Sequence, residues 1–159
     1  MEIRSYTPQD LDQMLALFYD TVHTVNAKDY TAQQQQAWAP DGCQRDQALR
    51  ARWDSTLCAH LSLLAFEGEQ LMGFGDIDIA QGYLDRLYVG AAFQRQGVAT
   101  ALCDRLEQAA YRAGSSTVWS DVSITARPFF ESRGYRVIRR QEVVRNGVVL
   151  VNFKMEKKF

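Results

Sequence analysis

The chain has 159 residues, of which 47% are hydrophobic and 23% are charged, as in an average globular protein. This length suits one domain with a sizeable core, so we expect a single domain over residues 1–159. A formal net charge of −1 argues against a nucleic-acid partner, and no apolar run is long enough to predict a membrane span.

The cysteines and histidines point to a reduced, metal-free protein. Cys43, Cys58 and Cys103 are odd in number and far apart, which predicts free thiols in the cytoplasm. The first residues also lack the layout of a signal peptide. Only two histidines occur, and neither forms a spaced pair with a cysteine or histidine, so we expect no bound metal.

The first third of the chain reads as one strand and three helices. We expect a strand at residues 3–6 and a helix over 8–26, which Thr7 caps. Apolar side chains recur in that helix at intervals of three and four residues. Two shorter helices are predicted at 31–38 and 44–55.

The middle of the chain changes to strands. Apolar segments at 57–66, 71–79 and 83–89 are separated by turn residues, which predicts antiparallel strands. A helix begins after Gly97, and Gly114 suits the position that ends it.

The last part predicts a strand at 117–122, a short helix at 125–133 and a terminal hairpin. The Asn146-Gly147 pair is a favoured two-residue turn between the two arms of that hairpin. A strand, a helix and a further strand in succession imply a locally parallel pair. The order of elements therefore predicts an α/β domain.

The segment at 84–100 carries the clearest functional pattern. A strand leads into a short loop, Gln94-Arg95-Gln96-Gly97-Val98-Ala99, that opens a helix. The first N–H groups of a helix lack partners within it and attract anions. Gly97 and Ala99 are small enough to let a phosphate approach the backbone, and Arg95 adds a cation. This segment is typical of an anion-binding cradle.

Two motifs resemble those of the GNAT N-acetyltransferase family. Gln94-x-x-Gly97-x-Ala99 is similar to the family's coenzyme A motif, and the segment from Ala126 to Tyr135 is similar to its later helix and turn. The resemblance implies a mixed, mostly antiparallel central sheet with helices on both faces. In such a fold two parallel strands, here 83–89 and 117–122, splay apart and the pantetheine arm of acetyl-coenzyme A lies between them.

The resemblance also implies the cofactor contacts. The strand that precedes the loop would face the pantetheine and thioester, the loop and helix start would hold the pyrophosphate, and the later motif would close the site. The residues implied are Leu87, Tyr88, Val89, Gln94, Arg95, Gln96, Gly97, Val98, Ala99, Thr100, Ser123, Phe129 and Phe130.

Transfer of an acetyl group to an amine requires a base, because an alkylammonium has a pKa of about 10.4 and is protonated at neutral pH. Asp85 is the first candidate, since alternation along the strand puts it on one face with Leu87 and Val89 and puts Arg86 on the other. Asp76 and Asp78, on the preceding strand, are the alternatives.

The general acid is a departure from the family pattern. The family commonly protonates the departing thiolate with a tyrosine, and Phe130 stands at that position here. Tyr88, Tyr83 or water are the alternative proton donors. The missing hydroxyl also leaves open a second function, that of a catalytically weak module that binds acyl-coenzyme A.

The acceptor is expected to be a primary amine of a small molecule or peptide. By resemblance to a group of small bacterial GNAT proteins, the region after the first helix would help to cover it, with His23, Asn26, Tyr30 and Trp38 as candidate contacts. Core packing of Trp38 and a structural His23 are the alternatives. The chain is expected to act as a monomer or a homodimer.

Overall fold

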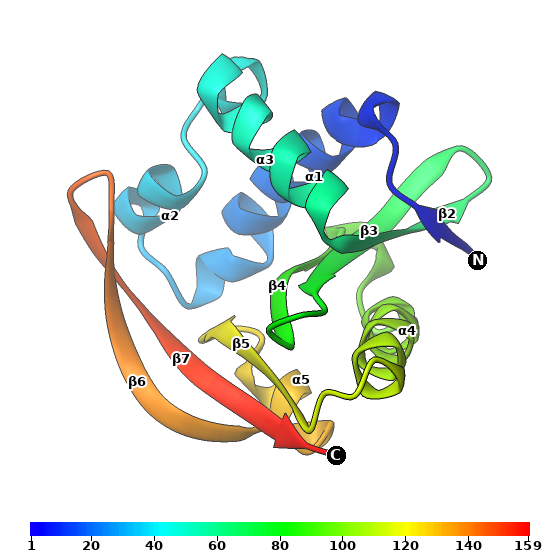
Figure 1. Ribbon diagram of the computed structural model, residues 1–159. Helices are drawn as coiled ribbons and strands as arrows, with labels where there is room; N and C mark the ends of the chain where they lie inside the picture. Colours follow the sequence, from blue (N-terminus) through cyan, green and yellow to red (C-terminus); the bar gives the residue numbers. More distant parts are fainter.

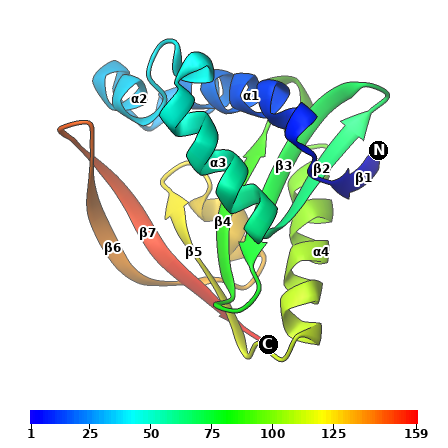
Figure 2. The ribbon, with the colours of Figure 1, turned by 45° about the horizontal axis from the view of Figure 1, so that its top comes forward.

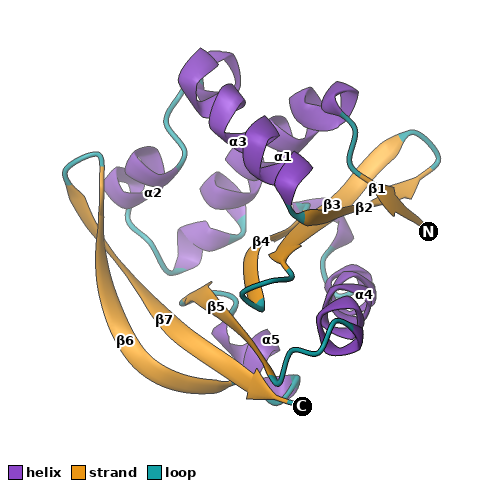
Figure 3. Ribbon diagram, in the orientation of Figure 1, coloured by secondary structure: helices purple, strands orange, loops and turns teal.

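The computed structural model describes residues 1–159 and shows an α/β protein built on one seven-stranded sheet. The strands lie in the order β1-β2-β3-β4-β5-β7-β6 (Figure 1, Figure 3). Every neighbouring pair is antiparallel except β4 and β5, which are parallel. The strands are β1 (Glu2–Ser5), β2 (Leu61–Glu67), β3 (Gln70–Asp78), β4 (Tyr83–Val89), β5 (Thr117–Ser123), β6 (Arg136–Arg145) and β7 (Val148–Lys158).

Helices cover both faces of the sheet (Figure 2). Those of the first third and those that follow β4 lie on opposite sides, as the two separate hydrophobic clusters show. The α-helices are α1 (Leu11–Thr24), α2 (Ala32–Trp38), α3 (Gln47–Ala59), α4 (Val98–Arg112) and α5 (Arg127–Ser132). None of them combines the length and apolar character that crossing a membrane requires.

Amphipathic spacing explains which helix packs where. Met14, Leu15 and Phe18 of α1 pack with Trp53 and Leu57 of α3 against the sheet. On the other face, α4 buries an apolar stripe of its own, which consists of Val98, Leu102, Cys103, Leu106 and Ala110. The sheet therefore has a hydrophobic core on each side.

The parallel strands separate almost as soon as they meet. Only Tyr83 and Trp119 are registered across β4 and β5, and their rings lie 4.3 Å apart. The hydroxyl of Ser120 donates to the carbonyl of Leu84 at 2.7 Å, just beyond that pair. Further along β4 the backbone groups that face β5 have no strand partner, so a gap opens there. The splayed pair expected from the sequence is confirmed.

One boundary differs from the sequence prediction. The apolar run at 57–66 is divided between the end of α3 and the start of β2, whereas a single strand was expected. Leu57 lies one helical turn after Trp53 and joins the same cluster, so tertiary packing holds it in the helix. The terminal hairpin agrees with expectation, because Asn146 and Gly147 both have positive φ angles, of 47° and 77°.

Candidate active site

A cavity of about 500 Å³ occupies the gap between the splayed strands. It runs from β4 past the first turn of α4 and is closed by the end of β5 and by α5. All but one of the cofactor contacts implied by the sequence line it: Leu87, Tyr88, Val89, Gln94, Arg95, Gly97, Val98, Ala99, Thr100, Ser123, Phe129 and Phe130. We call this cavity the cofactor cleft.

The loop before α4 is shaped by two residues with left-handed backbone. Arg95 has a φ of 60° and Gly97 a φ of 82°, and Gly97 precedes the first residue of the helix. The side-chain amide of Gln94 donates to the carbonyl of Val89 at 2.6 Å and ties the loop to the strand. A Cβ atom at Gly97 would meet nothing within 4 Å, so the helix start opens onto free space. This arrangement leaves the first N–H groups of α4 accessible to an anion.

Gln96 is the exception among the implied contacts. Its side-chain amide donates to the carbonyl of Ala92 at 3.1 Å, and the residue does not line the cleft. Its side chain therefore stabilises the loop locally.

The far wall of the cleft comes from the later motif. Ser123 accepts a hydrogen bond from the backbone N–H of Ala126 at 3.1 Å and so caps the turn into α5. Phe130 is only 3% exposed and packs edge-on against Phe129 and Tyr135. The ring at the family's tyrosine position thus belongs both to the core and to the wall of the cleft.

A second, larger cavity of about 1060 Å³ adjoins the first. Helices α2 and α3, strand β4 and the hairpin tip of β6 and β7 surround it, and we call it the acceptor cavity. Aromatic and apolar side chains form much of its wall, including Phe18, Tyr30, Trp38, Trp53 and Leu150. The two cavities share Trp38, Asp85, Arg86, Tyr88, Asp121 and Ser123. A molecule in one therefore lies next to a molecule in the other.

The four acceptor contacts expected from the sequence lie in different places. Tyr30 and Trp38 line the acceptor cavity, and the hydroxyl of Tyr30 donates to the carbonyl of Val151 at 2.6 Å. His23 lines neither cavity, because its Nε2 atom bonds the carbonyl of Ala39 at 2.7 Å and its ring stacks on Tyr19. Asn26 lies on the cofactor cleft instead.

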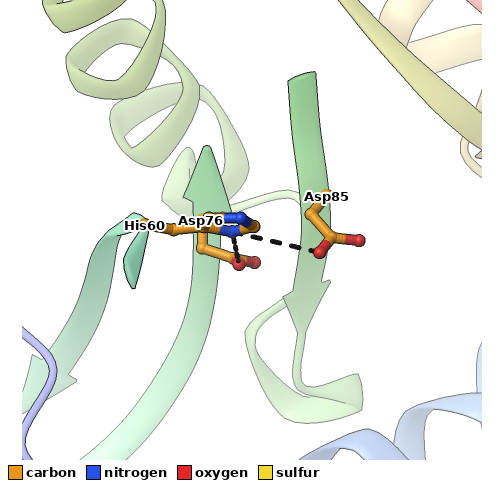
Figure 4. Close-up of side chains that lie close together, drawn as sticks. All are labelled: His60, Asp76 and Asp85. Atoms are coloured by element: carbon orange, nitrogen blue, oxygen red, sulfur yellow. Dashed lines mark hydrogen bonds and ion pairs between the residues drawn. The ribbon is translucent and has the colours of Figure 1, made fainter. Parts of the chain in front are cut away.

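Charged side chains gather where β3, β4 and the end of α3 meet (Figure 4). Asp76 is fully buried, and its Oδ2 atom accepts from Nδ1 of His60 and from Nη1 of Arg86, both at 2.7 Å. Asp85 lies further out, with its Oδ2 atom 3.6 Å from Arg86 Nη1 and 3.9 Å from His60 Nδ1. Of the two aspartates, only Asp85 lines the cavities. Asp76 instead orients His60 and Arg86 through its hydrogen bonds.

A β-bulge produces this cluster. Asp76 pairs with Arg86 but Ile77 pairs with Leu84, so Asp85 has no partner across the ladder. Arg86 consequently lies beside Asp85, and its guanidinium stacks on Trp53 of α3. The expectation that Arg86 faces away from Asp85 and that Asp85 shares a face with Leu87 was wrong, because regular alternation fails at the bulge.

Sequence reasoning also missed His60. It stands alone at the end of α3 and has no motif around it, and only the pairing of β2 with β3 brings it to Asp76. His60, Asp76 and Asp85 are close enough to hold a metal ion. The guanidinium of Arg86 already contacts both carboxylates and supplies positive charge there. The absence of a metal remains a prediction.

The surroundings shift the protonation of the key groups. Burial raises the pKa of Asp85 above its ordinary value, although Arg86 acts to lower it. The hydrogen bond to Asp76 raises the pKa of His60, which burial opposes. Burial also raises the pKa of the Tyr88 hydroxyl to about 12. A more basic carboxylate and a protonated phenol thus both line the junction of the two cavities.

Comparison with known proteins identifies the family. A model described as an acetyltransferase (GNAT) domain matches residues 26–157. The uncharacterized N-acetyltransferase YafP of Escherichia coli is 34% identical over 99% of this chain and 96% of its own. A crystal structure of a GCN5-related N-acetyltransferase from Rhodopseudomonas palustris superposes with a TM-score of 0.91 and 32% identity over 99% of this chain and 95% of its own.

A more distant solved structure is the PaiA N-acetyltransferase of Thermoplasma acidophilum in complex with coenzyme A. It has a TM-score of 0.75 at 22% identity and covers 99% of this chain and 98% of its own. At that identity the likeness shows the fold alone. The family model and the two relatives above 30% identity carry the assignment, and this chain belongs to the GNAT family of N-acetyltransferases.

Proposed function

We propose that this protein transfers an acetyl group from acetyl-coenzyme A to a primary amine of a small molecule or peptide, by direct attack of the amine while both substrates are bound. The observation that carries the proposal is the shared wall between the cofactor cleft and the acceptor cavity. Donor and acceptor placed in these cavities meet at Asp85, Tyr88 and Ser123, with no step through a covalent enzyme adduct.

Acetyl-coenzyme A suits the smaller cleft on chemical grounds. The N–H groups at the start of α4 and the guanidinium of Arg95 are placed to hold a pyrophosphate. The backbone of β4 at Leu87 and the N–H of Val89, which lack a partner on β5, would offer hydrogen bonds to the pantetheine arm and to the thioester carbonyl. A relative of the same fold was solved in complex with coenzyme A, which supports this choice.

In the proposed reaction Asp85 accepts a proton from the ammonium of the acceptor, directly or through one water. The neutral nitrogen then forms a bond to the acetyl carbon, the carbon–sulfur bond breaks, and the thiolate leaves. Tyr88 lines the same junction with its hydroxyl protonated, and in this scheme it donates the proton that the thiolate takes up. The acylated nitrogen then releases its second proton, which restores the hydroxyl of Tyr88 directly or through water. Asp76 and His60 hold Arg86, and Arg86 in turn fixes Asp85.

The phenylalanine at position 130 favours a second candidate, a module that binds acyl-coenzyme A but transfers the acyl group poorly. Turnover of the wild type with a panel of amines separates the two functions, and replacing Tyr88 by Phe tests the proposed acid. If Tyr88 is the proton donor, kcat falls by about 10²-fold in Tyr88→Phe. Tyr83→Phe is the matched control, because Tyr83 lines the acceptor cavity but bonds Asp121. Equal, wild-type rates in both variants would exclude Tyr88 as the acid.

The cofactor site is tested by Gly97→Val. A branched side chain at this position projects into the space assigned to the pyrophosphate and should weaken coenzyme A binding at least ~10-fold, since one lost charge-assisted contact is worth about 1.5 kcal/mol or more. Isothermal calorimetry with coenzyme A measures the affinity. A thiol-release assay across a panel of amines measures transfer.

The left-handed backbone of Gly97 makes a control necessary, because any side chain there strains the chain by about 1–2 kcal/mol. Gly114 has a φ of 97° with open space around it and follows the opposite end of α4. Gly114→Val should lose similar stability but keep full coenzyme A affinity. Undiminished binding by Gly97→Val would contradict the proposed site.

A further inference from the structure

Some charged side chains in the wall of the acceptor cavity have ion-pair or hydrogen-bond partners within the protein, and others have none. This wall contains six ionisable acidic or basic side chains: Asp46, Arg52, Asp85, Arg86, Asp121 and Arg145. Most of them have partners within the protein. Asp46 caps α3 by accepting from the backbone N–H groups of Ala48 and Leu49, at 3.0 and 3.2 Å. Arg86 is paired with Asp76.

The third partnered group is Asp121, whose carboxylate accepts from the hydroxyl of Tyr83 at 3.1 Å and from the amide of Gln141 at 2.8 Å. Asp85 lies at the junction of the two cavities, and in the proposed function it receives the amine. Two guanidinium groups then remain, those of Arg52 and Arg145. Neither forms an ion pair or a side-chain hydrogen bond, although both contribute to the cavity wall.

Some other arginine side chains on α3 and β6 do have ion-pair partners. Arg50, on the same helix as Arg52, pairs with Asp12 at 2.8 Å, and Arg140, on the same strand as Arg145, pairs with Glu142 at 3.1 Å. Arg136 of β6 and Arg105 of α4 are also unpaired, but they line neither cavity. Arg52 and Arg145 differ because α3 and β6 bring them to one cavity from separate elements.

Arg145 lines the same cavity as Tyr88, and Tyr88 also lines the cofactor cleft. The positive charge of Arg145 acts to lower the pKa of the Tyr88 hydroxyl, against the larger effect of burial. The guanidinium therefore belongs to the wall that a molecule in the acceptor cavity would meet.

Arg52 lies on the same helix as a residue that contacts the charged cluster. Thr56 follows it by four residues, and the hydroxyl of Thr56 accepts from Nη2 of Arg86 at 2.9 Å. Four residues advance about 6 Å along the helix axis. An anion at Arg52 and an amine at Asp85 would therefore be held by side chains of different elements.

We propose that the acceptor is a primary amine that also carries an oxyanion, a carboxylate or a phosphate-type group, on a different part of the molecule from the amine. Arg52 and Arg145 bind the oxyanion, the aromatic wall holds the body of the molecule, and Asp85 receives the amine. Guanidinium groups suit this task because their donors match the geometry of carboxylate and phosphate oxygens. This inference rests on the proposed function for the identity of the amine site.

Three amines of one shape test it: 4-(aminomethyl)benzoate, 4-(aminomethyl)phenylphosphonate and the neutral 4-(aminomethyl)benzamide. We expect kcat/KM to be at least ~10-fold higher for an anionic amine than for the amide, because the amide loses at least one charge-assisted hydrogen bond to the arginines. The benzoate and the phosphonate show which oxyanion is preferred. The advantage should fall below about 3-fold in the Arg52→Gln, Arg145→Gln double variant and persist in Arg105→Gln.

Calorimetric binding of the same amines to the coenzyme A complex provides a readout that needs no turnover. Preferential binding of an anionic amine, lost in the double variant, supports the inference even if no acetyl group is transferred, and in that case the proposed function fails alone. Equal use of all three amines overturns the inference and leaves the proposed function intact. Failure of all three to bind also overturns it. Each single variant, checked by thermal melting, replaces the double variant if the latter does not fold.

Discussion

At the scale of single residues, Asp85, the proposed base, is expected to lower the stability of the fold. It sits at a bulge with no partner across the ladder, and burial raises its pKa. For a carboxyl group whose pKa is raised by folding, the stabilising contribution is present at low pH and is lost as the pH rises through the folded-state pKa. At neutral pH the ionised Asp85 therefore destabilises the fold, as is common for functional groups.

The substitution Asp85→Asn should separate these two effects. Turnover should fall by about 10²-fold because the base is removed, while the melting temperature at pH 7 should rise because an ionised, partly buried group is removed. The wild-type kcat/KM should decline as the pH falls through the raised pKa of Asp85, and this decline should be absent from the variant. Thermal melts and a pH–rate profile measure both.

Asp78→Asn is the control for that experiment, because Asp78 belongs to the same pair of strands but only accepts from the backbone of Gln81 near the turn. It should leave the pH profile unchanged. Wild-type turnover in Asp85→Asn would show that another group takes the proton.

At the scale of elements, the sheet consists of two halves that are weakly joined. β4 and β5 share a single registered pair, so the strands alone hold the halves together poorly. Glu107 of α4 bridges them on one face. Its carboxylate accepts from Lys157 of β7 and from Tyr135, both at 2.8 Å, and pairs with Arg133 at 3.0 Å. These contacts attach α4 to the half that contains β5, β6 and β7.

Removal of this bridge should be costly. Glu107→Ala leaves Arg133 and Lys157 without their buried partner, which typically destabilises a protein by about 3–5 kcal/mol. Denaturant unfolding measures the change. Glu131→Ala removes an exposed carboxylate that pairs with Arg127, so it should alter the free energy of unfolding by less than about 1 kcal/mol. Similar losses in the two variants would contradict the bridging role.

The stability that Glu107 contributes depends on pH. Burial acts to raise the pKa of Glu107, but the hydrogen bonds from Arg133, Lys157 and Tyr135 outweigh it, and the pKa is lowered. Its contribution to stability is therefore complete above the ordinary glutamate pKa and is lost as the pH falls through the folded-state value. The Glu107→Ala variant should lose less stability than the wild type on acidification.

At the scale of the whole molecule, the proposed cofactor would lie in the gap that divides the sheet. A ligand that contacts β4, α4 and α5 together favours the folded state of both halves. Binding at 100 times Kd stabilises a protein by about 2.7 kcal/mol, and for a chain of this size each kcal/mol raises the melting temperature by about 2–4 °C. We therefore expect coenzyme A to raise the melting temperature by about 5–10 °C.

The rise in melting temperature measured with Gly97→Val and Gly114→Val shows whether coenzyme A binds in the cofactor cleft. The rise should fall to about half or less in the first variant at the same coenzyme A concentration and remain unchanged in the second. An equal rise in both would place coenzyme A elsewhere on the molecule. The expected state, a monomer or a homodimer, is a separate prediction that sedimentation of the free protein addresses.

The sequence by itself determined the local features. The loop before α4 and the turn at Asn146-Gly147 follow from residues next to each other in the chain, because small residues and positive φ angles are local requirements. The amphipathic spacing of α1 and α4 likewise predicted their buried faces. Together with two short motifs, these features were enough to identify the family and the splayed sheet.

Only the tertiary structure decided which charged groups meet. The bulge that turns Asp85 and Arg86 to one side depends on the register between β3 and β4, and periodicity within one strand does not reveal it. His60 and Asp76 come together through strand pairing, and Arg52 and Arg145 line one cavity from distant elements. Such contacts depend on how elements pack, and the sequence pattern of each element is compatible with more than one packing.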